Sequence, residues 1–339
     1  MQKPFPELTD LQLGTNEVGP GPILPDSFLG GTAPRLQSLH LWGIPFPGLP
    51  KLLLSATQLV NVSLYNIPRS GYVPPEAMAT TLSALTSLET LFLRFRFPSP
   101  RSALGSRRPP PRTRSILPRL TKIWFGGTSE YLEQILARID APRLNDSCIN
   151  FFNQLIFDTS QLYQFISRTP TLRSTNKGHI AFDLKAACVT FSSKRSDYGA
   201  LSMKIPCLAS EWQLSSLEQV CAPSLPPVST LEDLYIVGDR YHQPHWHDDV
   251  ENTLWLDVLR PFVAVKNLYI SEEFVPRIAP ALQELVGRRT TEVLPTLKNI
   301  FSGVFQPSRP IHEGIEKFVT ARRLTNHPVA VSFWNGYSG

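Results

Sequence analysis

The sequence predicts an α/β solenoid built from irregular repeats, and the spacing of its leucines carries that prediction. Seven segments read L-x-x-L-x-L or a close variant, and they recur along almost the whole 339-residue chain. Their starts lie 28, 23, 29 and 32 residues apart in the N-terminal run and 34 apart between the last two. Such a period is typical of stacked units that each pair a short strand with a helix or loop. The segments are Leu8-Leu11-Leu13, Leu36-Leu39-Leu41, Leu59-Val62-Leu64, Leu88-Leu91-Leu93, Leu120-Ile123-Phe125, Leu231-Leu234-Ile236 and Val265-Leu268-Ile270.

Each apolar triplet is expected to be a strand, because glycine or proline follows it and turns the chain. Helices are expected between the strands, at 48–57, 75–87, 129–139, 159–168, 210–221, 251–261, 273–289 and 312–324. The helix at 129–139 has an apolar stripe at helical spacing, with Ser129 as its expected N-cap. Strands joined by such crossovers run parallel. The expected fold is therefore a leucine-rich-repeat-like solenoid with a curved parallel sheet and helices on its outer face.

The region 144–206 follows the period less well. Four apolar stretches in it read as strands, at 144–151, 179–182, 188–191 and 201–205. The last two alternate in polarity on either side of a polar linker, which predicts a hairpin near 188–206 that decorates the solenoid. We therefore expect one domain, a single irregular solenoid over residues 1–339.

The stretch 98–115 interrupts one repeat. It contains five prolines and shows no helix or strand period, which predicts a disordered, solvent-exposed Arg/Pro-rich insertion. Residues 94–119 hold eight arginines and no acid, so the net charge of +5 falls to −3 when they are set aside. A neutral loop insertion is the preferred interpretation, and nuclear import, an SH3-type partner or nucleic acid are the alternatives. Without this segment the chain is slightly acidic, so nucleic-acid binding is not expected.

Composition narrows the function classes further. The sequence has no run of 18 or more apolar residues, so we expect no membrane-spanning helix. The opening MQKPFPELTD lacks the apolar core of a signal peptide, and the expected location is the cytoplasm or the nucleus. The four cysteines show no zinc-ligand spacing and are expected to be buried thiols: Cys148, Cys188, Cys207 and Cys221.

Enzyme chemistry has no motif to support it. The sequence contains no nucleophile elbow, P-loop, dinucleotide fingerprint, zinc-protease pair or kinase motif set, so we expect no catalytic residue and no cofactor. The stretch 241–249 concentrates histidines and aspartates as a metal site would. It lies in one irregular segment before an expected helix. Asp248 and Asp249 would interact favourably with the positive N-terminus of that helix. A helix-capping loop is the preferred interpretation, and no metal is expected.

Candidate binding residues lie between the core leucines. Side chains alternate across a strand, so these positions point away from the core, on the concave face of a solenoid. The residue types found there are those enriched at binding hot spots. The hypothesis is a protein-binding surface that comprises His40, Trp42, Tyr65, Phe92, Arg94, Trp124, Tyr235 and Tyr269. The alternative, left open, is that aromatic residues suit strands and cover one another across neighbouring repeats.

Five segments also carry a resemblance to a known family. They are FFNQLIFDTSQLYQFISRTP (151–170), WQLSSLEQVC (212–221), STLEDLYI (229–236), the block 248–301 and HPVAVSFW (327–334). These segments resemble the F-box-associated, leucine-rich-repeat-like proteins of mushroom-forming fungi, and only 98–115 falls clearly outside the resemblance. In that family an N-terminal F-box docks onto the Skp adaptor of a cullin ubiquitin ligase, and the repeats are presumed to select substrates. The resemblance thus implies a substrate-recognition module for an unidentified protein.

The chain departs from the family pattern in two ways. It opens at Pro4-Phe5-Pro6 inside a repeat, with no F-box, so we expect a truncated gene model or a degenerate copy. Skp binding is then expected only if an F-box exists upstream; the alternative is an adaptor-free interaction scaffold or a non-functional paralogue. The asparagine typical of leucine-rich repeats appears once, as Asn16, so the repeats are irregular.

Overall fold

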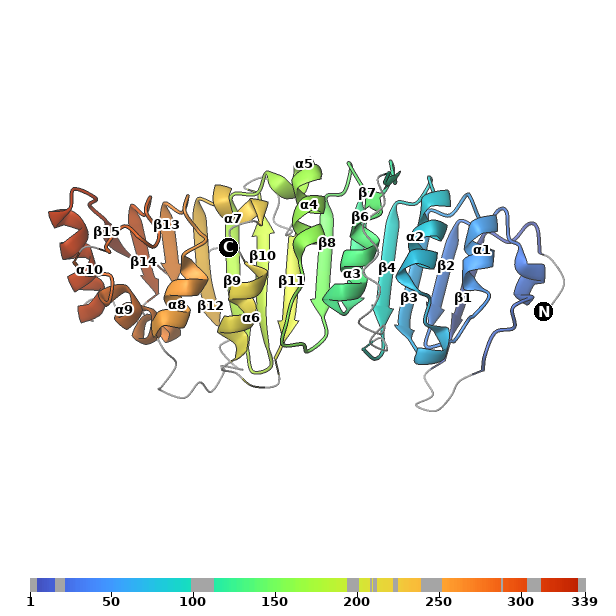
Figure 1. The fold of residues 1–339 in the computed structure, drawn as a ribbon, viewed down its shortest axis with the longest axis horizontal. Coiled ribbons are helices and arrows are strands. Elements are labelled where there is room, and N and C mark those ends of the chain that lie inside the picture. Colours follow the sequence, from blue (N-terminus) through green and yellow to red (C-terminus); the bar gives the residue numbers. More distant parts are fainter. Residues whose placement is uncertain are drawn as a thin grey trace. The chain divides into compact units, whose positions relative to one another are not determined.

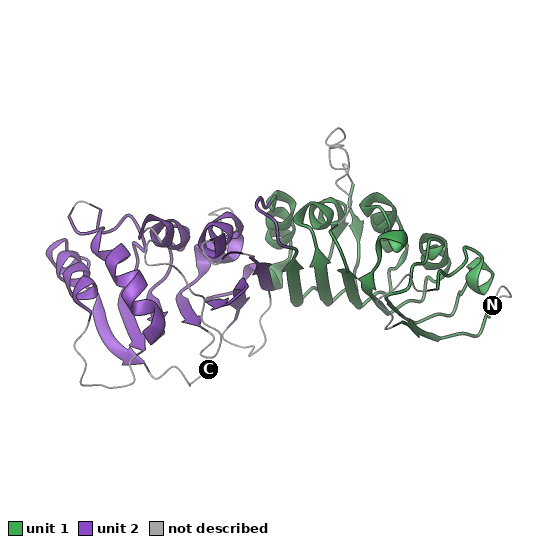
Figure 2. Ribbon diagram, turned by 90° about the horizontal axis from the view of Figure 1, so that it is seen from below, with its two compact units in different colours: residues 1–152, 158–172 green, residues 153–157, 173–339 purple. Residues whose placement is uncertain are grey.

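The computed structural model describes residues 5–15, 22–98, 113–193, 201–207, 209, 212–221, 225–238, 252–287, 289–303 and 312–334. They divide into two compact units (Figure 2): unit 1 comprises Met1–Phe152 and Asp158–Leu172, and unit 2 comprises Asn153–Phe157 and Arg173–Gly339. Whether both belong to the single solenoid expected over 1–339 stays a prediction. Residues 99–112 of the expected insertion, the segment 241–249 and Asn16 lie outside the described residues.

Unit 1 contains six parallel strands in chain order, and helices follow them in sequence (Figure 1). The strands are β1 (Asp10–Gly14), β2 (Ser38–Trp42), β3 (Asn61–Ile67), β4 (Thr90–Phe95), β6 (Lys122–Gly127) and β8 (Asp146–Phe151). The described helices are η1 (Phe28–Gly31), α1 (Leu49–Ser55), η2 (Arg69–Gly71), α2 (Pro75–Ala84), α3 (Ser129–Leu136), α4 (Ser160–Arg168) and α5 (Pro170–Arg173). A small second sheet pairs β5 (Ser115–Ile116) with β7 (Ile139–Asp140). The triplet side chains of β2, β3, β4 and β6 are buried, whereas those of β1 are half-buried.

A buried carboxylate joins two helices of unit 1. Glu133 of α3 accepts backbone hydrogen bonds from Gln161 (2.6 Å) and Leu162 (2.7 Å), in the first turn of α4. These N–H groups have no partner within their own helix, so the carboxylate caps α4. Burial raises the pKa of Glu133 to about 7, although the hydrogen bonds act to lower it.

The same backbone hydrogen bonds recur between neighbouring parallel strands of both units. In unit 1, the amides of Val60, Glu89 and Thr121 donate to the carbonyls of Gln37, Val60 and Glu89. In unit 2, Lys266, Lys298 and Ala330 donate in the same way to Glu232, Lys266 and Lys298. A tight turn also recurs before the strands, with Leu59, Leu88 and Leu297 donating to the residue three positions back. The irregular sequence period therefore corresponds to a regular backbone pattern in both units.

Unit 2 contains a mixed sheet in the order β11–β10–β9–β12–β13–β14–β15. The strands are β9 (Lys177–Asp183), β10 (Ala186–Ser192), β11 (Leu201–Pro206), β12 (Asp233–Gly238), β13 (Asn267–Ile270), β14 (Asn299–Gly303) and β15 (Ala330–Trp334). The hairpin expected near 188–206 is confirmed as the antiparallel pair β10–β11. It is not a decoration, because β10 also pairs with β9, which in turn pairs in parallel with β12. The hairpin is thus part of the sheet.

The helices of unit 2 lie along one face of its sheet (Figure 2). They are α6 (Trp212–Val220), α7 (Pro226–Thr230), α8 (Asn252–Leu259), η3 (Glu272–Phe274), α9 (Val275–Gln283) and α10 (Glu313–Leu324). Arg322 of α10 is fully buried and donates to the carbonyls of Thr290, Leu294, Pro295 and Leu297. A single guanidinium thereby supplies hydrogen bonds to four backbone carbonyls of the irregular segment that precedes β14. In this segment Leu294 has a positive φ of 50°.

The α/β class and the mostly parallel sheet are confirmed. Helices occur at all eight expected places, with ends that differ by up to six residues, the largest difference being the end of α9 at Gln283 instead of residue 289. The expected N-cap of α3 is wrong by one residue: the side chain of Thr128 accepts from the backbone amide of Tyr131, and Ser129 is already helical.

The expectation of four buried thiols is also wrong in part. Cys207 and Cys221 are buried, but Cys148 and Cys188 are half-exposed, because they occupy outward positions on β8 and β10. Among the described residues, no helix combines the length and apolar character needed to cross a membrane.

Candidate binding surface

The sheet of unit 1 presents a face of outward side chains in two rows. Parallel register aligns Gln12, His40, Ser63, Phe92 and Trp124 across five strands in the first row. The second row, two residues further along each strand, runs Gly14, Trp42 and Tyr65, and Arg94 follows on β4. We call these nine residues the aromatic face of unit 1. All six residues predicted for this part of the chain are brought together on it.

The rings of this face meet at varied angles. Trp42 and Tyr65 are perpendicular, with centroids 5.3 Å apart and planes at 83°. Tyr65 and Phe92 are tilted at 5.6 Å, whereas Phe92 and Trp124 stack at 4.2 Å and 4°. Trp42 remains 48% exposed, so its neighbours do not cover it.

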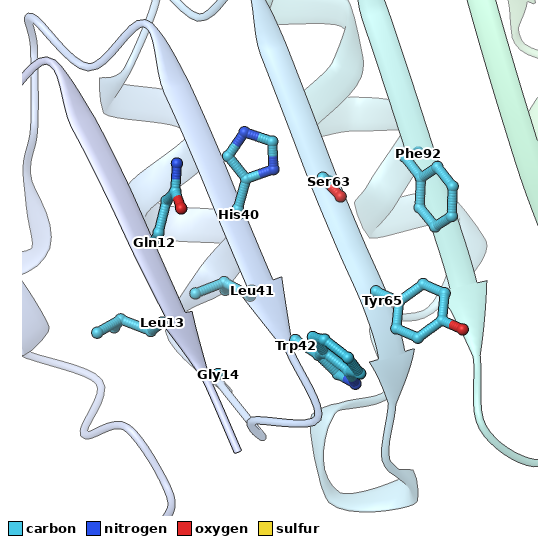
Figure 3. A pocket seen from close by; sticks show the side chains of 9 residues that line it. All are labelled: Gln12, Leu13, Gly14, His40, Leu41, Trp42, Ser63, Tyr65 and Phe92. Carbon is cyan, nitrogen blue, oxygen red and sulfur yellow. The ribbon is translucent and has the colours of Figure 1, made fainter. Parts of the chain in front are cut away.

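A hollow of about 440 Å³ opens between these side chains (Figure 3). The small or polar side chains of Gln12, His40 and Ser63 form one side of it, and the rings of Trp42 and Tyr65 form the next row. Phe92 closes the hollow at β4. His40 is held in place by a hydrogen bond with the hydroxyl of Ser38 (3.0 Å). The hollow therefore combines an apolar wall with a polar side, as ligand-binding hollows commonly do.

Arg94 lies among the rings rather than beside a carboxylate. Its Nη1 donates to the hydroxyl of Tyr65 at 2.7 Å. Its guanidinium carbon lies 5.0 Å from the ring centre of Tyr65 and 5.6 Å from that of Trp124. These contacts orient the guanidinium, because cation–π attraction and the hydrogen bond act on the same group.

The flat position of Trp124 depends on Gly126. A Cβ atom at Gly126 would lie 2.8 Å from Cγ of Arg94 and 3.0 Å from Cζ3 of Trp124. Glycine thus lets the indole ring and the arginine stem lie close to the strand. This residue was not among the predicted ones, although the Gly126-Gly127 pair at the end of a strand was a visible signal.

Tyr235 and Tyr269, the remaining predicted residues, belong to a different structure in unit 2. Register aligns His179, Tyr235, Tyr269 and Phe301 on four neighbouring strands. Successive ring centroids lie 4.4, 4.1 and 4.5 Å apart, and the planes differ by 5° to 8°. Trp334 meets Tyr235 and Tyr269 at 5.8 and 5.5 Å, with its plane at 60° and 68° to theirs. We call these five residues the aromatic stack of unit 2.

The polar side chains near the stack form hydrogen bonds with one another. The carboxylate of Asp233 accepts a hydrogen bond from the side-chain amide Nδ2 of Asn267 (2.6 Å). The side-chain Oδ1 of Asn267 accepts one from Nδ2 of Asn299 (2.8 Å). Burial, with a contribution from Tyr269, raises the pKa of Tyr235. Burial and the nearby charge of Lys177 lower the pKa of His179. Both shifts favour neutral side chains, as expected for groups that cover one another.

His179, Phe301 and Trp334 were not predicted to join this stack. The segment Leu297-x-x-Ile300-Phe301 repeats the first half of the leucine pattern, and this could have placed Phe301. Trp334 lies on the last described strand, without a leucine triplet to reveal its register. Among the described residues, no group of three or more His, Cys, Asp or Glu side chains could hold a metal ion.

Comparison with known proteins gives no family. The sequence matches no family model and no curated protein. Among solved structures, the leucine-rich repeat-containing protein LegL7 from Legionella pneumophila is similar, with 12% identity over 94% of this chain and 91% of that one. The TM-score is 0.29, and a likeness of that size carries no argument about fold or function.

Proposed function

We propose that the chain is a leucine-rich-repeat-like protein-recognition module without catalytic activity, and that it binds a protein partner through the aromatic face of unit 1. The repeated turn and hydrogen-bond pattern supports the solenoid part of the proposal. Solenoids of this type offer extended sheet faces for binding, and their repeats supply no chemistry of their own.

The observation that carries the proposal is Trp42. It is a large aromatic side chain, 48% exposed, at the rim of a hollow that nothing in the described chain fills. Trp42 lies beside the hollow and contacts Tyr65, which in turn holds Arg94. Tryptophan and arginine are typical of the centre of an interface, where a few residues supply most of the binding energy. Isolated exposed apolar residues are common, but this one continues into Tyr65 and Phe92.

The test is affinity purification followed by mass spectrometry, with the full chain as bait and two single variants beside it. Trp42→Ala removes the exposed ring, and Trp212→Ala removes a tryptophan of similar exposure (40%) on helix α6 of unit 2. We expect a protein that is recovered with the unmodified chain and with Trp212→Ala but is lost with Trp42→Ala. Retention by Trp42→Ala, or equal loss with both variants, would contradict the proposal.

The proposal has two forms that the family resemblance suggests. In one, an F-box encoded upstream docks onto the Skp adaptor, and the module selects substrates for a ubiquitin ligase. In the other, the module is an adaptor-free scaffold or a non-functional paralogue. Either form would act in the cytoplasm or the nucleus. Co-purification of the Skp adaptor with a chain extended by its native upstream sequence distinguishes the two forms.

A further inference from the structure

We infer that the partner segment bound by the aromatic face of unit 1 is acidic, with an apolar side chain that enters the hollow. This inference rests on the proposed function and specifies the chemistry of the partner. It comes from three arginines at the carboxyl ends of β3 and β4: Arg69, Arg94 and Arg96.

These arginines are held by aromatic rings. Arg94 lies over Tyr65 and Trp124, as described above. Arg69 and Arg96 both lie over the ring of Phe97, at 5.6 and 5.4 Å from its centre, and Phe97 is 44% exposed. Ring contacts of this kind leave the edges of a guanidinium available to oxygen acceptors.

None of the three arginines has a carboxylate within ion-pair distance among the described residues. Other arginines of unit 1 do: Arg119 pairs with Glu89 (3.1 Å), Arg138 with Glu76 (3.7 Å) and Arg168 with Asp140 (2.6 Å). For Arg94, one nitrogen is used by Tyr65, and the opposite Nε–Nη2 edge has no acceptor within the described chain. That edge matches the two oxygens of a carboxylate.

Charge is distributed unevenly along the strands of this face. At the amino ends, two residues before the first row, register aligns Asp10, Lys122 and Asp146, so both signs of charge occur there. At the carboxyl ends, among the described residues, the three arginines occur without an acid, and Arg94 contacts Tyr65, which lines the hollow. A bound segment that places carboxylates over the arginines and an apolar anchor in the hollow complements both features.

Single-stranded nucleic acid is the competing ligand, since arginines and aromatic rings also bind bases and phosphates. The ring geometry favours a peptide. Phe92 and Trp124 already cover each other at 4.2 Å, and Arg94 covers Trp124, so few ring faces remain for successive bases. The hollow of about 440 Å³ has room for the apolar side chain of a peptide.

The first experiment selects peptides on the full, unmodified chain from a displayed library of random twelve-residue peptides. Binders that also bind Trp42→Ala are discarded. We expect the remaining peptides to be enriched in Asp and Glu and to share an aromatic or aliphatic residue. Oligo(dT) and oligo(U) of twelve nucleotides are measured in parallel and are expected to bind at least about tenfold more weakly than the best peptide.

The second experiment measures the best peptide by fluorescence anisotropy against two triple variants of equal net charge. One carries Arg69→Gln, Arg94→Gln and Arg96→Gln. The matched control carries Arg143→Gln, Arg173→Gln and Arg323→Gln, three exposed arginines outside the cluster. We expect the first variant to weaken binding by more than about tenfold and the control by less than about threefold, because only the first removes arginines that would pair with carboxylates of the peptide.

The outcomes separate this inference from the proposed function. Peptides that need Trp42 but are neutral or basic, or an arginine-cluster variant that binds like its control, would overturn the acidic partner and leave the binding surface intact. Tighter binding of oligo(dT) or oligo(U) than of any peptide would overturn it in favour of nucleic acid. If no peptide distinguishes the unmodified chain from Trp42→Ala, both the inference and the proposed function fail. Because the selection uses the unmodified chain, it remains decisive even if the triple variant folds poorly.

Discussion

The aromatic face of unit 1 and the aromatic stack of unit 2 occupy equivalent outward positions on parallel strands, yet they differ in what covers their rings. In unit 2 a ring stands at the same register position on four successive strands, and each ring is covered by the next. In unit 1 the first row holds Gln12, His40 and Ser63 before its rings begin at Phe92, so these smaller polar side chains leave a hollow beside Trp42. The place of an aromatic residue in the strand pattern therefore predicts the face of the sheet on which its ring lies. Whether that ring is free to bind a partner depends on the side chains at the same register position on the neighbouring strands.

The two units also use arginine in opposite ways. Arg322 in unit 2 is fully buried, lies 5.7 Å from the ring centre of Phe318 and donates to four carbonyls. Arg94 in unit 1 makes one hydrogen bond and remains half-buried at the surface. Arg322 uses its donors to stabilise the fold of unit 2. Arg94 is oriented by its contacts, but some of its N–H donors have no acceptor among the described residues. Substitutions in each unit test this difference.

Arg322→Leu is expected to lower the free energy of unfolding of unit 2 by about 3–5 kcal/mol, because the carbonyls of Thr290, Leu294 and Leu297 lose their buried donor. The matched change Arg94→Leu is expected to cost less than about 1 kcal/mol. Urea unfolding of both variants gives the comparison. Similar losses would show that the two arginines have the same structural role.

Tyr269→Ala is expected to cost about 2–3 kcal/mol, because Tyr269 contacts Tyr235, Phe301 and Trp334 at once. Hydrogen exchange of β12, β13 and β14 locates the loss in unit 2. Peptide binding at unit 1 should not change. A stable variant with reduced binding would instead assign the stack of unit 2 to recognition.

Gly126→Ala is expected to cost about 1–2 kcal/mol and to displace Trp124 from Phe92, since the new methyl group meets Arg94 and Trp124 below 3.1 Å. Gly14→Ala is the control on the same face. Its Cβ would meet Cβ of Trp42 at 3.4 Å, an ordinary contact, and we expect a change of less than about 0.5 kcal/mol. Tryptophan fluorescence and urea unfolding report both effects, and equal costs would contradict the close packing of Trp124.

His179→Phe is expected to remove a small pH dependence of unit 2. The folded state lowers the pKa of His179 below 6.5, so the unfolded chain binds more protons in this range and stability falls as the pH drops below about 6.5. The effect is roughly a few tenths of a kcal/mol, because the ring is only partly buried. Unfolding free energies at pH 5 and pH 7.5 should therefore differ less for the variant. An unchanged difference would show that His179 does not titrate with folding.

Much of the fold was visible in the sequence because leucine spacing, glycine and proline turns and helical stripes are local signals. The strands of the triplets and the eight long helices follow from them. The place of the β10–β11 hairpin within the sheet was not visible, because the return of β12 to pair beside β9 depends on contacts distant in sequence. For the candidate site, alternation correctly put Trp42 and Tyr269 on outward faces. It could not separate an open face from a closed stack, since that depends on residues such as Ser63 and Phe301 on the neighbouring strands.

We propose that unit 1, and not the stack of unit 2, presents the recognition surface. Hydroxyl-radical footprinting with mass spectrometry tests it directly, by comparing the free chain with the chain bound to its best selected peptide. We expect rapid oxidation of Trp42 in the free chain and slower oxidation of Trp42, Tyr65 and Phe92 when the peptide is bound. The oxidation rates of Tyr235 and Tyr269 should not change. Protection confined to Tyr235, Tyr269 and Trp334 would contradict it.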